Sequence, residues 1–201
     1  VTRVLDLKEN LGLFDAPLSL EPLTDEENAD FENVLYELAK SAQTLVTNHN
    51  GAIPFDPKKV KKAAILTLSS MEDFKKELPS MVDAFAKHGV EATIVEKFNG
   101  KILEQIDKEN DLIIYACQIK SGFAQGMPFF DRPELVQLFH SMSYGAEKSV
   151  VISFGHPSVY YNYFENCDMY INTYSADKCA MTAVVDGILG DFTDRKSTRL
   201  N

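Results

Sequence analysis

The residues best able to do chemistry stand where hydrophobic runs end, and one histidine is among them. The stretch Ile152–Phe164 reads ISFGHPSVYYNYF. In it an apolar run stops at Gly155, His156 and Pro157, ahead of a group of tyrosines. An imidazole at such a corner could contact a sugar or a partner surface, because its ring both donates and accepts hydrogen bonds. A structural corner is the favoured alternative, with Gly155 permitting the tight path and Pro157 fixing it.

Other reaction classes lack the residue patterns that they need. No G-x-S-x-G surrounds a serine, so Ser69, Ser70 and Ser175 are better explained as helix caps. No G-x-G-x-x-G and no Walker loop follows an apolar run, which argues against a nucleotide site. His88 lies late in an expected helix, where a cation suits the helix dipole, and a structural or solvated role is expected for it.

Neither a carboxylate pair nor a metal cluster can be assigned. Glycosidic chemistry needs two acids that face one cleft, and Glu165, Asp168 and Asp177 do not form a convincing pair. The three cysteines lie far apart and lack C-x-x-C spacing. We therefore predict no catalytic residue, no metal ligand and no cofactor for this chain.

The segments that must position these residues alternate between extended and helical patterns. Strands are expected at 63–68, 90–95, 112–117, 149–154 and 169–173, with a short extended piece at 44–47. Helical spacing is expected at 1–14, 24–42, 71–88, 101–108, 133–142 and 175–189. Within 71–88, Pro79 is expected either to kink the helix or to restart it. This order predicts an α/β fold, a mostly parallel β-sheet with helices on both faces.

Local signals mark where several of these helices begin and end. Thr24 and Glu27 are spaced as a capping box. An apolar stripe follows them: Phe31, Val34, Leu35, Leu38 and Ala42. Gly12 is expected to stop the first helix, and 15–23 is expected to be a linker because it contains two prolines and no periodicity.

The amino-acid composition limits the kinds of molecule that the chain is expected to bind. Acidic residues number 30 and basic residues 20, which gives a net charge of −10. Such a chain repels phosphate backbones, so nucleic acid is not an expected partner. The sequence contains no run of 18 apolar residues, so no transmembrane helix is expected. The scattered cysteines fit small buried side chains in a reducing compartment, which favours the cytoplasm.

Four stretches resemble parts of glycoside hydrolase family 3, whose enzymes carry a C-terminal α/β sandwich domain. RVLDLKENLGLFD (Arg3–Asp15) resembles the last helix of the family's catalytic (β/α)₈ barrel and the linker that leaves it. LAKSAQTLVTNHNGAIPFD (Leu38–Asp56) resembles the segment that crosses into the second domain. KKAAILTL (Lys61–Leu68) resembles that domain's first core strand, and Ser153–Phe192 resembles its closing strand-loop-strand-helix unit.

The resemblance implies a piece of a retaining glycosidase of carbohydrate metabolism. The full-length enzyme would hydrolyse β-linked N-acetylglucosamine or β-glucosides. The chain is most similar to β-N-acetylhexosaminidase-like members, and β-glucosidase-like members remain open. The family's nucleophilic aspartate belongs to the barrel, upstream of Val1, so no catalytic residue transfers to this chain and the piece alone is expected to be inactive. Its implied partners are the missing N-terminal barrel and, through the full-length enzyme, a carbohydrate substrate. His156 would approach the substrate cleft, and Tyr160, Tyr161 and Tyr163 would be half-buried.

We therefore expect three segments. Residues 1–23 would be the end of an upstream barrel domain and a linker, and residues 24–193 the α/β sandwich domain. Residues 194–201 would be a non-native tail, because RKSTRLN resembles translated sequencing-adaptor read-through. The alternative is a standalone module of flavodoxin-like architecture that binds a small ligand or another protein.

Overall fold

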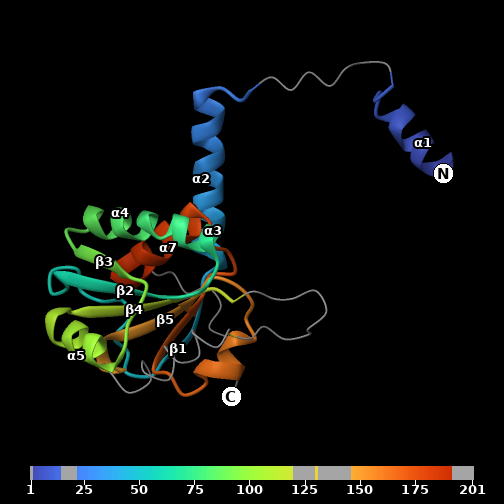
Figure 1. Ribbon diagram of the computed structural model, residues 1–201. Helices are drawn as coiled ribbons and strands as arrows, with labels where there is room; N and C mark the ends of the chain where they lie inside the picture. Colours follow the sequence, from blue (N-terminus) through green and yellow to red (C-terminus); the bar gives the residue numbers. More distant parts are fainter. Residues whose placement is uncertain (1, 15–21, 120–129, 131–145, 192–201) are drawn as a thin grey trace. The chain divides into compact units, whose positions relative to one another are not determined.

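The computed structural model describes residues 2–14, 22–119, 130 and 146–191 (Figure 1). The chain divides into two units, Val1–Asn33 and Val34–Asn201. In the first, α1 (Thr2–Asn10) is followed by Gly12, which takes a φ of +65°. That left-handed conformation suits glycine and confirms the predicted stop. The expected helix at 133–142 and the expected tail lie outside the described residues, and the expected segment boundaries stay a prediction.

The helix α2 (Asp25–Ala42) begins at the predicted capping box. The Thr24 amide and hydroxyl each donate to Glu27 Oε2 at 2.9 Å, and the Glu27 amide donates back to Thr24 Oγ1 at 3.2 Å. The apolar stripe of α2 is largely solvent-exposed, because Phe31, Val34 and Leu38 are 56%, 56% and 59% exposed. No residue of α2 is buried, so its apolar stripe does not pack into a core among the described residues.

One six-stranded sheet forms the centre of the second unit, in the order β1-β6-β5-β4-β2-β3. Its strands are β1 (Thr44–Asn48), β2 (Lys62–Leu68), β3 (Glu91–Val95), β4 (Leu112–Cys117), β5 (Ser149–Ser153) and β6 (Met169–Asn172). All neighbours pair in parallel except β1, which pairs antiparallel with β6. The predicted α/β fold with a mostly parallel sheet is confirmed, and the short extended piece is its antiparallel edge strand.

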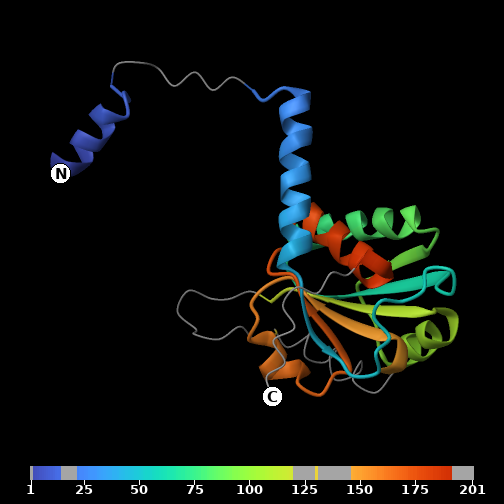
Figure 2. The ribbon, with the colours of Figure 1, turned by 180° about the vertical axis from the view of Figure 1, so that it is seen from behind.

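Helices cover both faces of this sheet (Figures 1 and 2). One face carries α3 (Glu72–Glu77), α4 (Pro79–Lys87) and α7 (Lys178–Asp186), and the other carries α5 (Gly100–Glu109). The helical segment expected at 71–88 is two helices, because Pro79 starts α4 directly after the Leu78 cap. Of the two outcomes expected at Pro79, the structure has the restart. Proline is well tolerated at a helix start and breaks a helix interior.

Each face of the sheet has its own hydrophobic core. Phe85 of α4 and Val184 of α7 belong to one core, which includes Ile65 and Ile114 of the sheet. Leu103 of α5 belongs to the other, with strand residues of the opposite alternation. Strands buried on both sides read as continuous apolar runs, which is why the sequence located them well.

Candidate functional site at the carboxyl edge of the sheet

The carboxyl ends of the parallel strands form one edge of the sheet, where open α/β folds bind ligands. A single row of registered neighbours crosses this edge: Leu68 of β2, Cys117 of β4, Ser153 of β5 and Asn172 of β6. Residues in register on neighbouring strands point to the same face of a sheet. The row therefore places a buried hydroxyl and a buried carboxamide side by side.

Buried polar atoms without a hydrogen-bond partner gather at this same edge. Within the described part of the chain they belong to Gln43, Thr67, Ser153, Tyr170 and Asn172. Thr67, Ser153 and Asn172 are the last or next-to-last residues of their strands. Gln43 directly precedes β1, whose first residue pairs with Asn172. Native proteins rarely leave such atoms unpaired, so their concentration at one edge marks it as a candidate binding site.

The loop that follows β6 is fixed by hydrogen bonds and contains one residue in a strained backbone conformation. Thr173 Oγ1 lies 3.2 Å from the carbonyl oxygen of Ser153 and 2.9 Å from that of Ser175, so its hydroxyl can donate to either. Tyr174 adopts a φ of +63°, a left-handed conformation that is unfavourable for a residue with a side chain. Its hydroxyl lies 3.1 Å from Thr44 Oγ1 at the start of β1. The loop is thus fixed to both neighbouring strands.

Asp177 caps α7 at this edge. Its Oδ1 accepts a hydrogen bond from the Ala180 amide at 3.0 Å, while the Ser175 hydroxyl donates to Oδ2. The prediction that Ser175 is the N-cap is wrong, since the carboxylate two residues later takes the capping position. Partial burial would raise the pKa of Asp177, but hydrogen bonds from Ser175 and from the first-turn amides lower it overall. The Asp177 carboxylate is therefore already used for helix capping.

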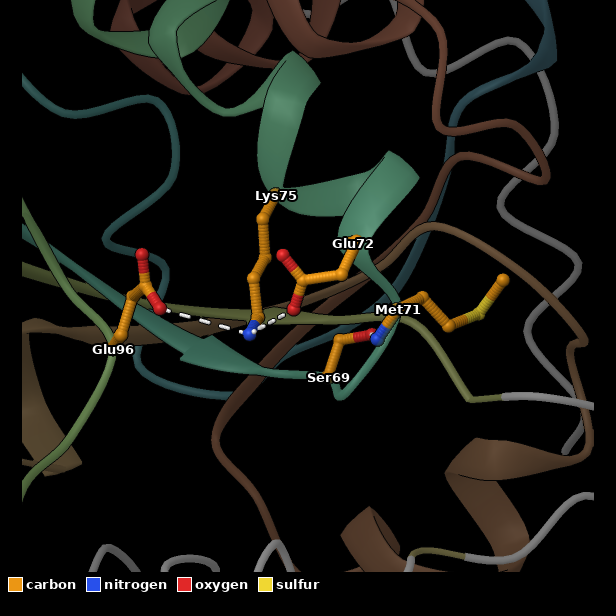
Figure 3. A network of polar contacts seen from close by, with 5 residues as sticks. All are labelled: Ser69, Met71, Glu72, Lys75 and Glu96. Carbon is orange, nitrogen blue, oxygen red and sulfur yellow. Dashed lines mark hydrogen bonds and ion pairs between the residues drawn. The ribbon is translucent and has the colours of Figure 1, made fainter.

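The charged groups beyond β2 are paired with one another (Figure 3). Lys75 Nζ lies 2.9 Å from Glu72 Oε1 and 3.6 Å from Glu96 Oε2, and the hydrogen bond with Glu72 is the main cause of the raised pKa of Lys75. The Ser69 hydroxyl accepts a hydrogen bond from the Met71 amide at 3.1 Å. Because Met71 is the N-cap of α3, the prediction that Ser69 caps this helix is wrong.

His156 lies just beyond β5, at the predicted strand exit, and is exposed. Its Nδ1 accepts a hydrogen bond from the Ser158 amide at 3.2 Å and lies 2.7 Å from the Ser158 hydroxyl. Gly155 is not among the residues with positive φ, and a Cβ there would meet only Gln118 Cγ, at 3.9 Å. The corner therefore does not require glycine, which corrects that part of the prediction. A sugar contact by His156 stays a prediction.

The tyrosines after this corner support the sheet. The Tyr160 ring meets that of Tyr170 edge-on at 5.1 Å, and Tyr163 meets Phe130 at 4.8 Å. Tyr160 and Tyr163 are half-buried as predicted, whereas Tyr161 is 62% exposed, so the prediction was wrong for that ring. Such edge-to-face pairs fix the β6 side of the core.

A cavity of about 600 Å³ lies at the opposite edge, where the parallel strands begin. Most of its charged lining groups are already paired. Lys148 Nζ donates to the Asn110 carbonyl at 2.8 Å, and Lys108 Nζ lies 2.6 Å from Glu104 Oε1. Asp111 accepts the amides of Lys61 and Lys62. With these groups already paired, the cavity is a weaker candidate than the carboxyl edge.

The described residues contain no group of three or more histidine, cysteine, aspartate or glutamate side chains that could hold a metal ion. Among the helices described, none has the length and apolar character needed to cross a bilayer. The sequence analysis did not identify Asn172 and Ser153. The only sign of them in the sequence is that each is a polar residue at the end of an otherwise largely apolar strand.

The parallel sheet, its antiparallel edge strand and the helices on both faces define an α/β sandwich. No family model and no curated protein sequence matches the chain. Solved structures do match. A fungal multi-domain GH3 β-N-acetylglucosaminidase is 22% identical with a TM-score of 0.67, and the match covers 95% of this chain and 21% of that one. A β-glucosidase from Listeria innocua is 18% identical with a TM-score of 0.67, over 94% of this chain and 30% of that one.

The β-glucoside phosphorylase BglX is also similar, with 18% identity and a TM-score of 0.63, over 94% of this chain and 35% of that one. At these identities the likeness shows a shared fold. The chain therefore has the fold of one part of these larger proteins, GH3 enzymes among them, and it spans between 21% and 35% of their length.

Proposed function

We propose that this chain is the α/β sandwich domain of a longer, retaining glycoside hydrolase of family 3. The coverage of the structural matches supports this most directly, because nearly all of this chain aligns with only a third or less of proteins that include GH3 glycosidases. The resemblance of Arg3–Asp15 to the end of a barrel domain supports it independently. The substrates would be β-linked N-acetylglucosamine or β-glucosides.

In this proposal the sandwich shapes the carbohydrate cleft from its carboxyl edge, and a (β/α)₈ barrel supplies the nucleophile. Retention requires two carboxyl groups about 5–5.5 Å apart, one nucleophile and one acid/base. The described carboxylates nearest this edge are engaged elsewhere, since Glu72 pairs with Lys75 and Asp177 caps α7. The domain alone would therefore not cleave a glycoside. His156 would reach the cleft from the exit of β5.

The coding sequence upstream of Val1 tests the proposal. We expect it to continue, in frame, into about 300 or more residues with alternating strand and helix patterns typical of a (β/α)₈ barrel. An in-frame start codon close to Val1, with no such region before it, would refute the proposal. That result would favour a standalone module that binds a small ligand or a partner.

A further inference from the structure

We propose that Asn172 and Ser153 form a buried subsite for a neutral hydroxyl group of a polyhydroxylated ligand. The subsite lies at the carboxyl edge of the sheet, between β5 and β6. Its ligand class rests on the proposed function, in which the ligand is a carbohydrate. The position of the subsite rests on the structure of this chain.

The two side chains are neighbours in a fixed frame. Ser153 and Asn172 are registered partners at the ends of two parallel strands, and each is only 1% exposed. Just beyond them, the Thr173 hydroxyl contacts the carbonyl oxygen of Ser153, which joins the two strand ends. Both side chains are therefore placed by the sheet and not by a loop.

The polar atoms of Asn172 have no partner among the described residues: both the nitrogen and the oxygen of its carboxamide are buried without a hydrogen bond. The Ser153 hydroxyl has no hydrogen bond of normal length there, and the polar group that lies close to it is the Tyr170 hydroxyl. A buried polar group that is left unpaired destabilises the fold. A ligand that supplied the missing hydrogen bonds would account for these groups.

The chemistry of the subsite selects a neutral group that both donates and accepts. A carboxamide offers two donor hydrogens and an acceptor oxygen, and a serine hydroxyl does both. The neighbouring Tyr170 hydroxyl is also buried. Burial raises the pKa of Tyr170, while a weak hydrogen bond with Ser153 acts in the opposite direction, so this group too is neutral. An alcohol hydroxyl matches this set, whereas a charged ligand would lack a counter-ion.

Access is from the loops that follow β5 and β6. His156 and Pro157 are exposed two or more residues beyond β5, and Tyr174 is 49% exposed two residues beyond Asn172. The loops that follow the buried pair are therefore open to solvent. In this proposal the ligand contacts these loops and reaches the pair with one hydroxyl group.

Side-chain amide spectra of the ¹⁵N-labelled 201-residue chain test the subsite. The Asn172 NH₂ signals are assigned as those lost in Asn172→Leu. Titration with N-acetyl-D-glucosamine and with D-glucose is expected to shift these signals saturably in the millimolar range. Ser153→Ala should weaken the binding about tenfold, as expected for the loss of about 1.4 kcal/mol. Thr67→Val is the matched control, because Thr67 Oγ1 is also buried and unpaired but alternates to the other face of the sheet.

Three results would overturn the subsite: no shift with either sugar, a shift unaffected by Ser153→Ala, or an Asn172 NH₂ that exchanges magnetisation with a bound water only. Should Asn172→Leu fail to fold, triple-resonance assignment of the parent chain identifies the Asn172 NH₂ signals, and Ser153→Ala and the control still decide the outcome. The two proposals fail separately. An upstream barrel without sugar shifts removes the subsite alone, whereas sugar shifts without an upstream barrel remove the family 3 proposal and leave a binding module.

Discussion

His88 Nε2 lies 2.7 Å from Asp186 Oδ1, which ties the end of α4 to the end of α7. The other oxygen of the same carboxylate accepts a hydrogen bond from the Tyr36 hydroxyl of α2 at 2.6 Å. Asp186 of α7 is thus a shared hydrogen-bond partner for α2 and for the end of α4, with its side chain 18% exposed. This contact supports the structural role expected for His88 and identifies Asp186 as its partner.

Replacing Asp186 with alanine should lower the free energy of unfolding by about 1–3 kcal/mol, because two donors lose their acceptor in a partly buried place. Urea unfolding followed by circular dichroism measures this. Tyr36→Phe should cost less, since it removes one donor and leaves the carboxylate bonded to His88. Tyr161→Phe, at an exposed tyrosine, is the control and should be close to neutral. Equal stability of Asp186→Ala and the parent chain would contradict this role.

The N-cap of α7 can be tested by comparing two neighbours. Asp177→Ala should cost about 1 kcal/mol, because the Ala180 amide loses its acceptor at the helix start. Ser175→Ala should cost less, since the Asp177 cap remains. Chemical denaturation of both variants gives the ranking. The reverse order would restore Ser175 as the cap.

Acid stability should depend on Asp111. Its carboxylate accepts the amides of Lys61 at 2.8 Å and Lys62 at 3.0 Å, and these hydrogen bonds lower its pKa in the folded chain. A lowered folded pKa stabilises the fold above the unfolded value of about 3.9, and that contribution is lost as the pH falls through the folded pKa.

Asp111→Asn should therefore reduce stability at pH 7 and flatten the fall in stability on acidification below about pH 4. Unfolding curves at neutral and acidic pH give both quantities. Asp83→Asn on the exposed side of α4 serves as the control. An unchanged acid profile in Asp111→Asn would show that these two hydrogen bonds do not matter for folding.

The thiol of Cys167 should react slowly with alkylating reagents. Burial is the main cause that raises its pKa to about 11, and its Sγ lies 3.7 Å from the Met169 carbonyl oxygen. Since the thiolate is the reactive form, alkylation of Cys167 at pH 8 should be about 100-fold slower than that of an ordinary cysteine. Peptide mass spectrometry after timed alkylation of the folded chain measures it. A rate equal to that in the urea-unfolded chain would contradict the burial effect.

The fold was largely predictable, and the reason is physical. Strands β2 and β4 are buried on both faces, so each is a continuous apolar run that needs no partner to be recognised. The antiparallel pairing of β1 with β6 was not predictable, because it joins residues that lie more than 100 positions apart. The division between α3 and α4 was visible only as Pro79, which allowed either a kink or a new helix.

The candidate site was much less predictable than the fold. Hydrophobic periodicity identifies residues that leave water, whereas Asn172 and Ser153 are polar residues buried without partners. Only the strand register brings them together. His156 was predicted at a strand exit and lies there, but its nearest polar neighbour, Ser158, is local, so position alone did not define a site.

The most direct measurement is hydrolysis of p-nitrophenyl N-acetyl-β-glucosaminide and p-nitrophenyl β-glucoside by two purified proteins, this 201-residue chain and the chain extended through its upstream coding region. We predict cleavage by the extended protein with retained anomeric configuration, and none by the shorter one. Turnover by the shorter chain that persists through stringent purification, or an extended protein that cleaves neither substrate, would contradict the view of this molecule as one domain of a larger glycosidase.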